Sequence, residues 1–247
     1  MRASLTGRHR PIAPAEVLPR PPAAGHTTIV IAAYNEGPSI GDVVRELLAD
    51  YSNVVVVDDG SEDDTAARAR EAGASVLVHL VNRGQGAALQ TGISYALARG
   101  ASYIVTFDAD GQHDKADLPA LLAPIESGLA DICLGSRFLE RRERIPALRR
   151  FVLWCAVLFM RVTTHARLSD AHNGLRAFSQ RAALTLDLKL DRMAHASEIV
   201  DQIVASRLRY VEVPVRVRYT DYSMRKGQRS SAAFRVAFDY LMGRLIR

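Results

Sequence analysis

The chain has 247 residues, of which 48% are apolar and 24% charged, as expected for a folded globular protein of one large or two small domains. Two distant cysteines, Cys133 and Cys155, form no C-x-x-C motif, which argues against a zinc site or a disulfide framework and favours a reducing, cytoplasmic compartment. No stretch reaches the roughly 20 apolar residues that a membrane-spanning helix needs. We also expect no secretory signal, because the N-terminus lacks an apolar core.

The net charge of +5 is concentrated at the two ends of the chain. The first 25 residues carry four arginines against one glutamate, and the last 23 carry six basic residues against one aspartate. Basic ends favour anionic partners, which leaves nucleic acid, anionic lipid and phosphorylated substrates open at this stage.

Composition divides the chain into three parts. Residues 1–25 are rich in Pro and Arg without a hydrophobic period, so we expect a disordered tail. Residues 26–228 carry the strand and helix patterns of a folded domain. Residues 229–247 predict a basic amphipathic helix, which either packs on the domain or lies on a membrane surface. Its apolar stripe consists of Phe234, Phe238, Leu241 and Leu245.

The hydrophobic pattern of the central part alternates between strands and helices in chain order. Expected strands cover residues 28–33, 54–57, 75–80, 103–107 and 132–135. Expected helices begin at Ser39 as N-cap, at Thr65 behind a capping box of Ser61 and Asp64, at Ala87 and near Leu118. This order predicts an α/β fold with a Rossmann-like, mostly parallel sheet, helices on both faces and ligands at the carboxyl ends of the strands.

A second apolar segment, residues 151–160, is flanked by Arg149, Arg150 and Arg161. Ten apolar residues are too few to span a bilayer. The segment is either a buried helix or an interfacial helix whose arginines reach lipid phosphates.

The fourth expected strand ends in Asp108-Ala109-Asp110-Gly111-Gln112-His113. On an extended chain Asp108, Asp110 and Gln112 share one face, and two carboxylates with an amide oxygen suit Mg²⁺ or Mn²⁺. The alternative is an acidic surface turn. We expect His113 to be a solvated turn residue, and neither His172 nor His195 has a second histidine at the spacing of a zinc site.

Five segments fall at the expected strand ends: Ala32–Glu36, Val57–Thr65, Asn82–Ala88, Phe107–His113 and Gly135–Phe138. Together they resemble family-2 glycosyltransferases of the GT-A fold, especially the branch of dolichyl-phosphate mannosyltransferases and bacterial polyprenyl-phosphate glycosyltransferases. The resemblance covers roughly Thr27 to Gln228. The glycine motifs of P-loop and dinucleotide-binding proteins are both absent from the sequence.

The resemblance implies roles for individual residues. Tyr34 and Glu36 would hold the base and ribose of a nucleotide-sugar, and Asp59 would meet the edge of the base. The implied nucleotide-sugar-binding set is Ala33, Tyr34, Glu36, Asp59, Gln85, Asp108 and Ala109. The implied metal ligands are Asp108, Asp110 and Gln112, and the implied catalytic residues are Asp110, Arg137, Asp170, Arg176 and Lys226. The family's usual Ser-Lys pair is replaced here by Lys226-Gly227-Gln228.

The resemblance further implies an inverting, metal-dependent transfer of a hexose from a UDP- or GDP-sugar to a polyprenyl phosphate at the cytoplasmic membrane face. A phosphate acceptor needs no strong general base, whereas a hydroxyl acceptor would need one, with Asp170 or Glu198 as candidates. A soluble phosphorylated or hydroxyl acceptor therefore stays open. The resemblance favours a peripheral membrane contact over nucleic acid and leaves a homo-oligomer open.

Two other classes remain as alternatives. A nucleotidyltransferase would carry a Gly-rich loop with Arg and Lys after the first strand, where this chain has Tyr34-Asn35-Glu36. A silent binding module would not need the intact pair of Asp108 and Asp110.

Overall fold

The computed structural model describes residues 27–139, 168–170, 173–188 and 194–218. The strands are β1 Thr27–Ala33, β2 Asn53–Asp58, β3 Ser75–Val78, β4 Tyr103–Asp108, β5 Ile132–Ser136, β6 Arg176–Ser179 and β7 Tyr210–Pro214. The helices are α1 Gly37–Leu48, α2 Thr65–Glu71, α3 Gln85–Ala98, the 3-10 helix η2 Lys115–Asp117, α4 Leu118–Glu126, α6 Gln180–Thr185 and α7 Ala194–Ala205. Several expected features lie outside the described residues: the tail 1–25, the segment 151–160, His172, Lys226 and the helix 229–247.

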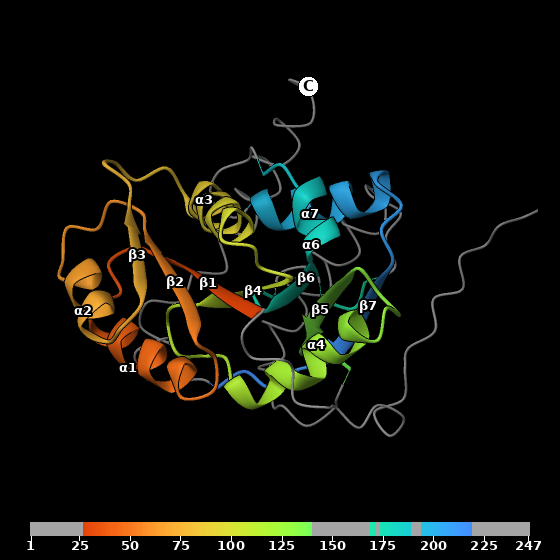
Figure 1. The fold of residues 1–247 in the computed structure, drawn as a ribbon, viewed down its shortest axis with the longest axis horizontal. Helices are drawn as coiled ribbons and strands as arrows, with labels where there is room; N and C mark the ends of the chain where they lie inside the picture. Colours follow the sequence, from red (N-terminus) through yellow and green to blue (C-terminus); the bar gives the residue numbers. More distant parts are fainter. Residues whose placement is uncertain (1–26, 140–167, 171–172, 189–193, 219–247) are drawn as a thin grey trace, which may run out of the picture.

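The seven strands form one sheet in the order β3-β2-β1-β4-β6-β5-β7 (Figure 1). The pairs β1–β2, β1–β4, β2–β3 and β5–β7 are parallel, whereas β6 runs antiparallel to both β4 and β5. The predicted mostly parallel α/β sheet is confirmed. The antiparallel strand was not predicted, because its four residues are too short to show a period of their own.

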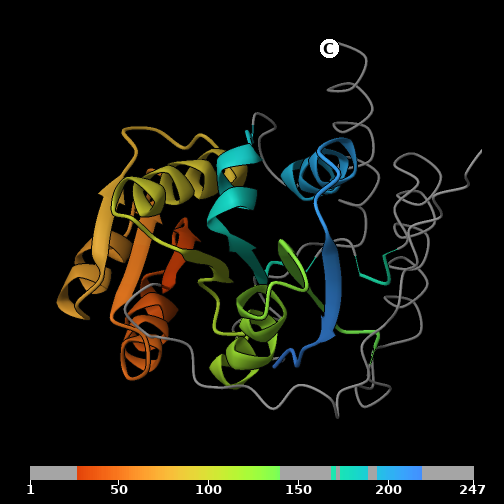
Figure 2. The ribbon, with the colours of Figure 1, turned by 45° about the vertical axis from the view of Figure 1, so that its right-hand side comes forward.

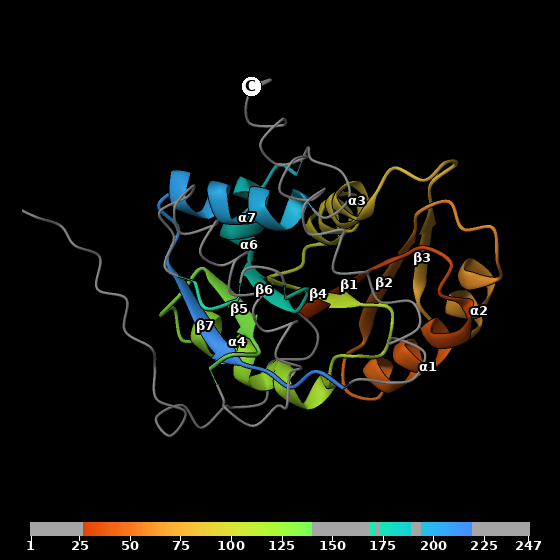
Figure 3. The same ribbon diagram turned by 180° about the vertical axis from the view of Figure 1, so that it is seen from behind.

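Helices cover both faces of the sheet, as the views from opposite sides show (Figures 1 and 3). Helices α1, α2 and α4 lie on one face, and α3, α6 and α7 lie on the other. Figure 2 shows β7 at the opposite edge of the sheet from β3. The two-sided cover explains the continuous apolar run of β2, since side chains on both of its faces are buried.

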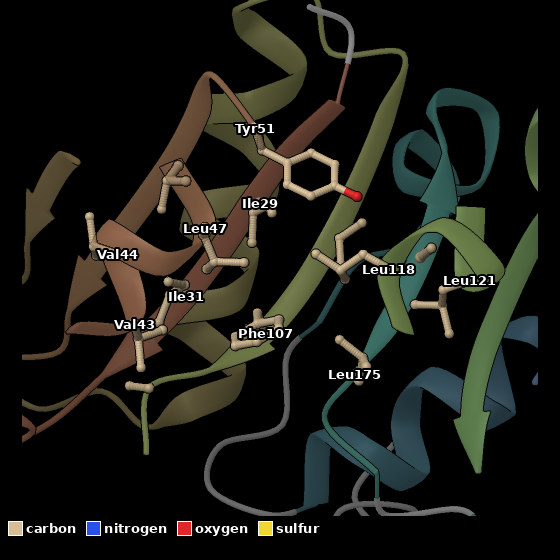
Figure 4. Close-up of a cluster of buried hydrophobic side chains, with 14 of the residues drawn as sticks. Ile29, Ile31, Val43, Val44, Leu47, Tyr51, Phe107, Leu118, Leu121 and Leu175 are labelled. Carbon is tan, nitrogen blue, oxygen red and sulfur yellow. The ribbon is translucent and has the colours of Figure 1, made fainter. Parts of the chain in front are cut away.

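Side chains of β1 alternate between two apolar clusters. Ile29 and Ile31 pack with α1 and α4, while Val30 packs with α3 on the opposite face. Figure 4 shows the first cluster, in which Phe107 from β4 lies beside β1 and α1. Because Phe107 points into this core, Asp108 follows it at the rim of the sheet. The core therefore sets where the acidic segment begins.

Two expected helix caps were wrong, although α2 begins at Thr65 as predicted. Helix α1 begins at Gly37, and Ser39 lies within its first turn, where its hydroxyl donates to the Glu36 carbonyl at 3.2 Å. Ser61 does not cap α2, because its Oγ accepts from the Asn35 amide at 2.9 Å. Hydrogen bonds to Glu36 and Asn35 in the loop after β1 therefore take up both serine hydroxyls, and the local capping pattern is not followed.

Candidate active site

The chain reverses its strand order between β1 and β4, which lie side by side with their carboxyl ends at the same edge. In doubly wound sheets this switch point is where ligands bind. Ala32 of β1 is in register with Asp108 of β4, and Ala33 with Asp58 of β2. The predicted site segments after β1, β2 and β4 therefore meet at one edge.

The loops after β1 and β2 are tied together by hydrogen bonds. The Glu36 amide donates to Thr65 Oγ1 at 2.8 Å, and the Glu62 amide donates to Asn35 Oδ1 at 2.9 Å. Asn35 takes a left-handed backbone conformation with φ of 52°. Tyr34 is 41% exposed at the surface of this paired loop, and its contact with a base stays a prediction.

Asp59 is buried and holds the loop that precedes α3. Its carboxylate accepts from the Arg83 amide at 3.0 Å and from the Gly84 amide at 2.7 Å. His79 Nδ1 lies 2.7 Å from the same carboxylate, and His79 Nε2 lies 3.0 Å from Thr91 Oγ1. The implied contact of Asp59 with a base edge is a prediction, but its position as an anchor of this loop is observed. His79 was not among the predicted site residues, and it contacts the same carboxylate.

Asp108 ends β4 within a set of polar neighbours. His113 Nε2 lies 2.8 Å from its Oδ2, and Gln85 Nε2 donates to its Oδ1 at 3.4 Å. His113 is only 4% exposed and packs edge-on against Phe107. The expectation of a solvated turn histidine was therefore wrong: the ring is buried because it supports Asp108. Gln85 and Asp108 both belong to the predicted nucleotide-sugar-binding set, and the structure places them in contact.

Asp110 lies in a turn and not on an extended chain. The strand ends at Asp108, Gly111 takes φ of 72°, and the Gln112 amide folds back to donate to Asp110 Oδ1 at 3.0 Å. The argument from strand alternation was thus wrong, although a turn still brings both carboxylates to one place. Burial, and then the Asp108 carboxylate, raise the pKa of Asp110 to about 6.

Two carboxylates that disfavour each other's ionisation form a suitable donor set for a hard divalent cation. Asp108 and Asp110 offer oxygen ligands, and Mg²⁺ commonly takes one or two carboxylates with water and substrate phosphate completing the set. Within the described ranges, no three His, Cys, Asp or Glu side chains form a group that would hold a metal by itself. The residues therefore fit a cation that is shared with a substrate.

Arg176 opens β6 beside this acidic pair. It is 3% exposed, and burial lowers the pKa of its guanidinium to about 10, against the opposing effect of the Asp108 and Asp170 carboxylates. Thr106 Oγ1 donates to the Gly174 carbonyl at 2.7 Å and fastens the segment before β6 to β4. Arg176 therefore places a buried positive charge among the predicted catalytic acids.

Arg137 and Asp170 form a bidentate ion pair. Arg137 Nε and Nη2 donate to the two carboxylate oxygens at 2.7 and 2.9 Å, and the Asp170 side chain is almost completely buried. Both were predicted site residues, and the structure brings them together at the end of β5. The Asp170 carboxylate is therefore paired with the Arg137 guanidinium. This pairing favours a role in orienting Arg137 over a role in removing a proton from a substrate.

The segment after β7 is fastened to the loop that follows the acidic turn. The Arg218 amide donates to the Gln112 carbonyl at 2.7 Å, and His113 forms a β-bridge with Val217. Arg218 Nη2 also lies 2.7 Å from Asp114 Oδ2. These contacts hold the loop that carries His113 from outside the core sheet.

The remaining predicted residues fall into distinct places. Ala33 and Ala109 are buried at the ends of β1 and β4, where they bring backbone but no reactive side chain to the site. Glu198, the alternative base candidate, is 1% exposed on α7 and is followed by Ile199 of the second cluster. Glu198 therefore does not face water.

The switch-point site and the sheet topology define a GT-A glycosyltransferase. The chain belongs to glycosyl transferase family 2, whose model matches residues 28–183. It is 30% identical to a UDP-N-acetylglucosamine–dolichyl-phosphate N-acetylglucosaminyltransferase of Methanococcus voltae over 87% of this chain and 94% of that protein. It is 31% identical to a polyprenol monophosphomannose synthase of Mycolicibacterium smegmatis, over 90% and 89%.

Solved structures show the same fold. A glucosyl-3-phosphoglycerate synthase from Mycobacterium tuberculosis superposes with a TM-score of 0.63 at 20% identity, over 87% of this chain and 79% of that one. The predicted family and fold are confirmed, and the alternatives of a nucleotidyltransferase and a silent binding module are set aside. No helix within the described residues is both long and apolar enough to cross a membrane.

Proposed function

We propose that this protein transfers a hexose from a nucleotide-sugar to a polyprenyl phosphate, with inversion and with Mg²⁺ or Mn²⁺ as cofactor. The observation that carries the proposal is the row of charges at the switch point. Asp110 and Asp108 form an acidic end, followed by the buried Arg176 and then by the pair of Asp170 and Arg137. The acidic end suits a cation with a diphosphate, and the arginine end suits a second phosphate.

The donor would bind over the loops of β1 and β2, with Tyr34 and Glu36 at the nucleoside and Asp59 with its loop at the base. Asp108 and Asp110 would hold the divalent ion, which when bound stabilises the negative charge of the departing diphosphate as a Lewis acid. Solved relatives in this fold support the assignment, since one is described with Mn²⁺, UDP-glucose and phosphoglyceric acid.

The acceptor would present a phosphate oxygen to the anomeric carbon. That oxygen is ionised near neutral pH, so no carboxylate has to remove a proton. Asp170 is bound to Arg137 and Glu198 is only 1% exposed, which supports an acceptor that needs no base. Arg176 and Arg137 would offset the charge of the two phosphates as they approach.

The names of the similar enzymes support a lipid-linked phosphate, because they act on dolichyl phosphate or form polyprenol monophosphomannose. Such an acceptor places the reaction at a membrane, and we assign it to the cytoplasmic face, where the protein would bind peripherally. The basic residues at both ends of the chain support this placement.

The test is a panel of UDP- and GDP-sugars with the full chain and Mg²⁺ or Mn²⁺. Three acceptors are compared: undecaprenyl phosphate in detergent, undecaprenol and phosphoglyceric acid. We expect sugar on undecaprenyl phosphate alone, and no product with EDTA. Transfer to undecaprenol or phosphoglyceric acid in place of the lipid phosphate, or full activity without metal, would overturn the proposal.

A further inference from the structure

We propose that Glu212, on the edge strand β7, is a positioning residue for the acceptor side of the reaction. It holds the segment that carries Asp170, and Asp170 in turn orients Arg137. The effect on transfer rests on the proposed function, because it requires Arg137 to lie at the acceptor phosphate. The effect on the orientation of Arg137 does not.

The Glu212 carboxylate binds two consecutive backbone amides. The Ser169 amide lies 2.9 Å from both carboxylate oxygens, and the Asp170 amide donates to Oε1 at 3.1 Å. The Ser169 hydroxyl donates to the same Oε1 at 2.9 Å. Consecutive amides that point to one place bind anions strongly. Here the anion is a side chain of the protein itself.

The held segment is fastened at two further points. Ser169 Oγ lies 2.6 Å from Ser136 Oγ at the end of β5, and Leu168 is buried beneath α6 and α7. With the backbone of Asp170 held in this way, its carboxylate meets Arg137 in two hydrogen bonds and also accepts from the Arg137 amide at 3.2 Å. A continuous chain of contacts thus runs from β7 to the Arg137 guanidinium.

This position is costly for an acid. Glu212 stands in an apolar strand, Val211-Glu212-Val213, in register with Leu134 of β5. Burial raises the pKa of Glu212, the nearby Asp170 carboxylate adds to the rise, and hydrogen bonds from Ser169 and Asp170 oppose it. Among the described residues no arginine or lysine forms an ion pair with Glu212. A carboxylate held at such a place by two backbone amides and the Ser169 hydroxyl indicates a positioning role.

The experiment compares Glu212→Gln with Asp131→Asn in the full chain. Glutamine keeps one acceptor oxygen but turns an NH₂ group toward the Ser169 amide. Asp131 is the matched control, because it is a buried acid at the opposite end of the same β5–β7 pair and binds Arg209. Two readouts are taken: the side-chain Nε–H signal of Arg137 by NMR, identified by its loss in Arg137→Lys, and the kinetics of transfer to undecaprenyl phosphate.

In Glu212→Gln we expect the Arg137 signal to shift or broaden through faster exchange. We also expect KM for undecaprenyl phosphate to rise about tenfold, equivalent to about 1.4 kcal/mol, with donor affinity within about twofold of wild type. Asp131→Asn should change neither readout. An unchanged Arg137 signal in Glu212→Gln, or equal changes in both variants, would overturn the inference. If the wild type fails to use undecaprenyl phosphate, the proposed function fails while the NMR readout still decides the role of Glu212.

Discussion

Gly174 leaves open the space that the Asp108 carboxylate occupies, since a Cβ at position 174 would overlap both carboxylate oxygens. The two residues lie 66 positions apart in the chain and meet because β6 pairs with β4, with Thr106 fastening the Gly174 carbonyl. Gly174 is therefore part of the acidic site. Its role depends on space and not on an unusual backbone conformation.

Gly174→Ala should displace Asp108 and lower transfer by about 100-fold, the usual effect of losing one group that stabilises charge in a transition state. The measurement is kcat/KM together with donor affinity in the presence of Mn²⁺. Gly41→Ala is the control, because its Cβ would meet only the flexible side chain of Arg45 within α1. Wild-type transfer in Gly174→Ala would show that Asp108 tolerates displacement.

Asp110→Asn should reduce transfer by about 100-fold or more, because the divalent ion loses a charged ligand. The amide oxygen of asparagine can still accept from the Gln112 amide, so the turn should keep its shape. Transfer is measured over a range of Mg²⁺ and Mn²⁺ concentrations. Activity near that of the wild type would contradict the assignment of Asp110 to the metal.

The same variant should be more stable than the wild type when metal is removed with EDTA. The folded-state pKa of Asp110 is raised from 3.8 to about 6, so the wild type loses stability as the pH rises through this window. Asparagine does not ionise and avoids the loss, which we expect to be about 1–2 kcal/mol at pH 7.5. Denaturant unfolding at pH 7.5 and pH 4 checks the sign: the advantage should shrink at the lower pH.

His79→Ala should weaken donor binding. The substitution removes one of three groups that bind the Asp59 carboxylate, so the loop of Arg83 and Gly84 loses its orientation. We expect KM for the nucleotide-sugar to rise about tenfold, with little change in KM for the acceptor. Thr91→Val, which removes only the contact at the far ring nitrogen, should have a smaller effect. An equal change in both KM values would contradict a specific role of His79 on the donor side.

Asp131→Asn should lower the free energy of unfolding by about 1–2 kcal/mol without changing transfer. Hydrogen bonds from Arg209 hold the pKa of Asp131 below its ordinary value. Its stabilising effect is therefore present at neutral pH and is lost as the pH falls below about 4. Unfolding curves of both proteins should converge in that acidic range; a constant difference down to pH 2 would contradict the ion-pair explanation.

Local sequence patterns predicted much of the fold. The β-branched run of β2 and the helical spacing in α1 predicted their elements, because burial imposes a period on short segments. The predicted strands also placed Asp59, Asp108 and Arg137 at strand ends. The capping prediction at Ser61 failed because the loop after β1 binds its hydroxyl, which a single segment cannot show, whereas the Ser39 hydroxyl binds Glu36 within its own helix turn.

The sequence by itself determined the alternating α/β order, the family and the acidic and basic residues of the site. It also contained an acid within an apolar strand, Glu212, whose role was not predicted. Only the tertiary structure decided which residues act together. It paired Arg137 with Asp170, buried His113 behind Asp108, and set Gly174 against the same carboxylate. Arg137 with Asp170 and Gly174 with Asp108 join segments far apart in the chain, and His113 is held by its β-bridge with Val217, which follows β7.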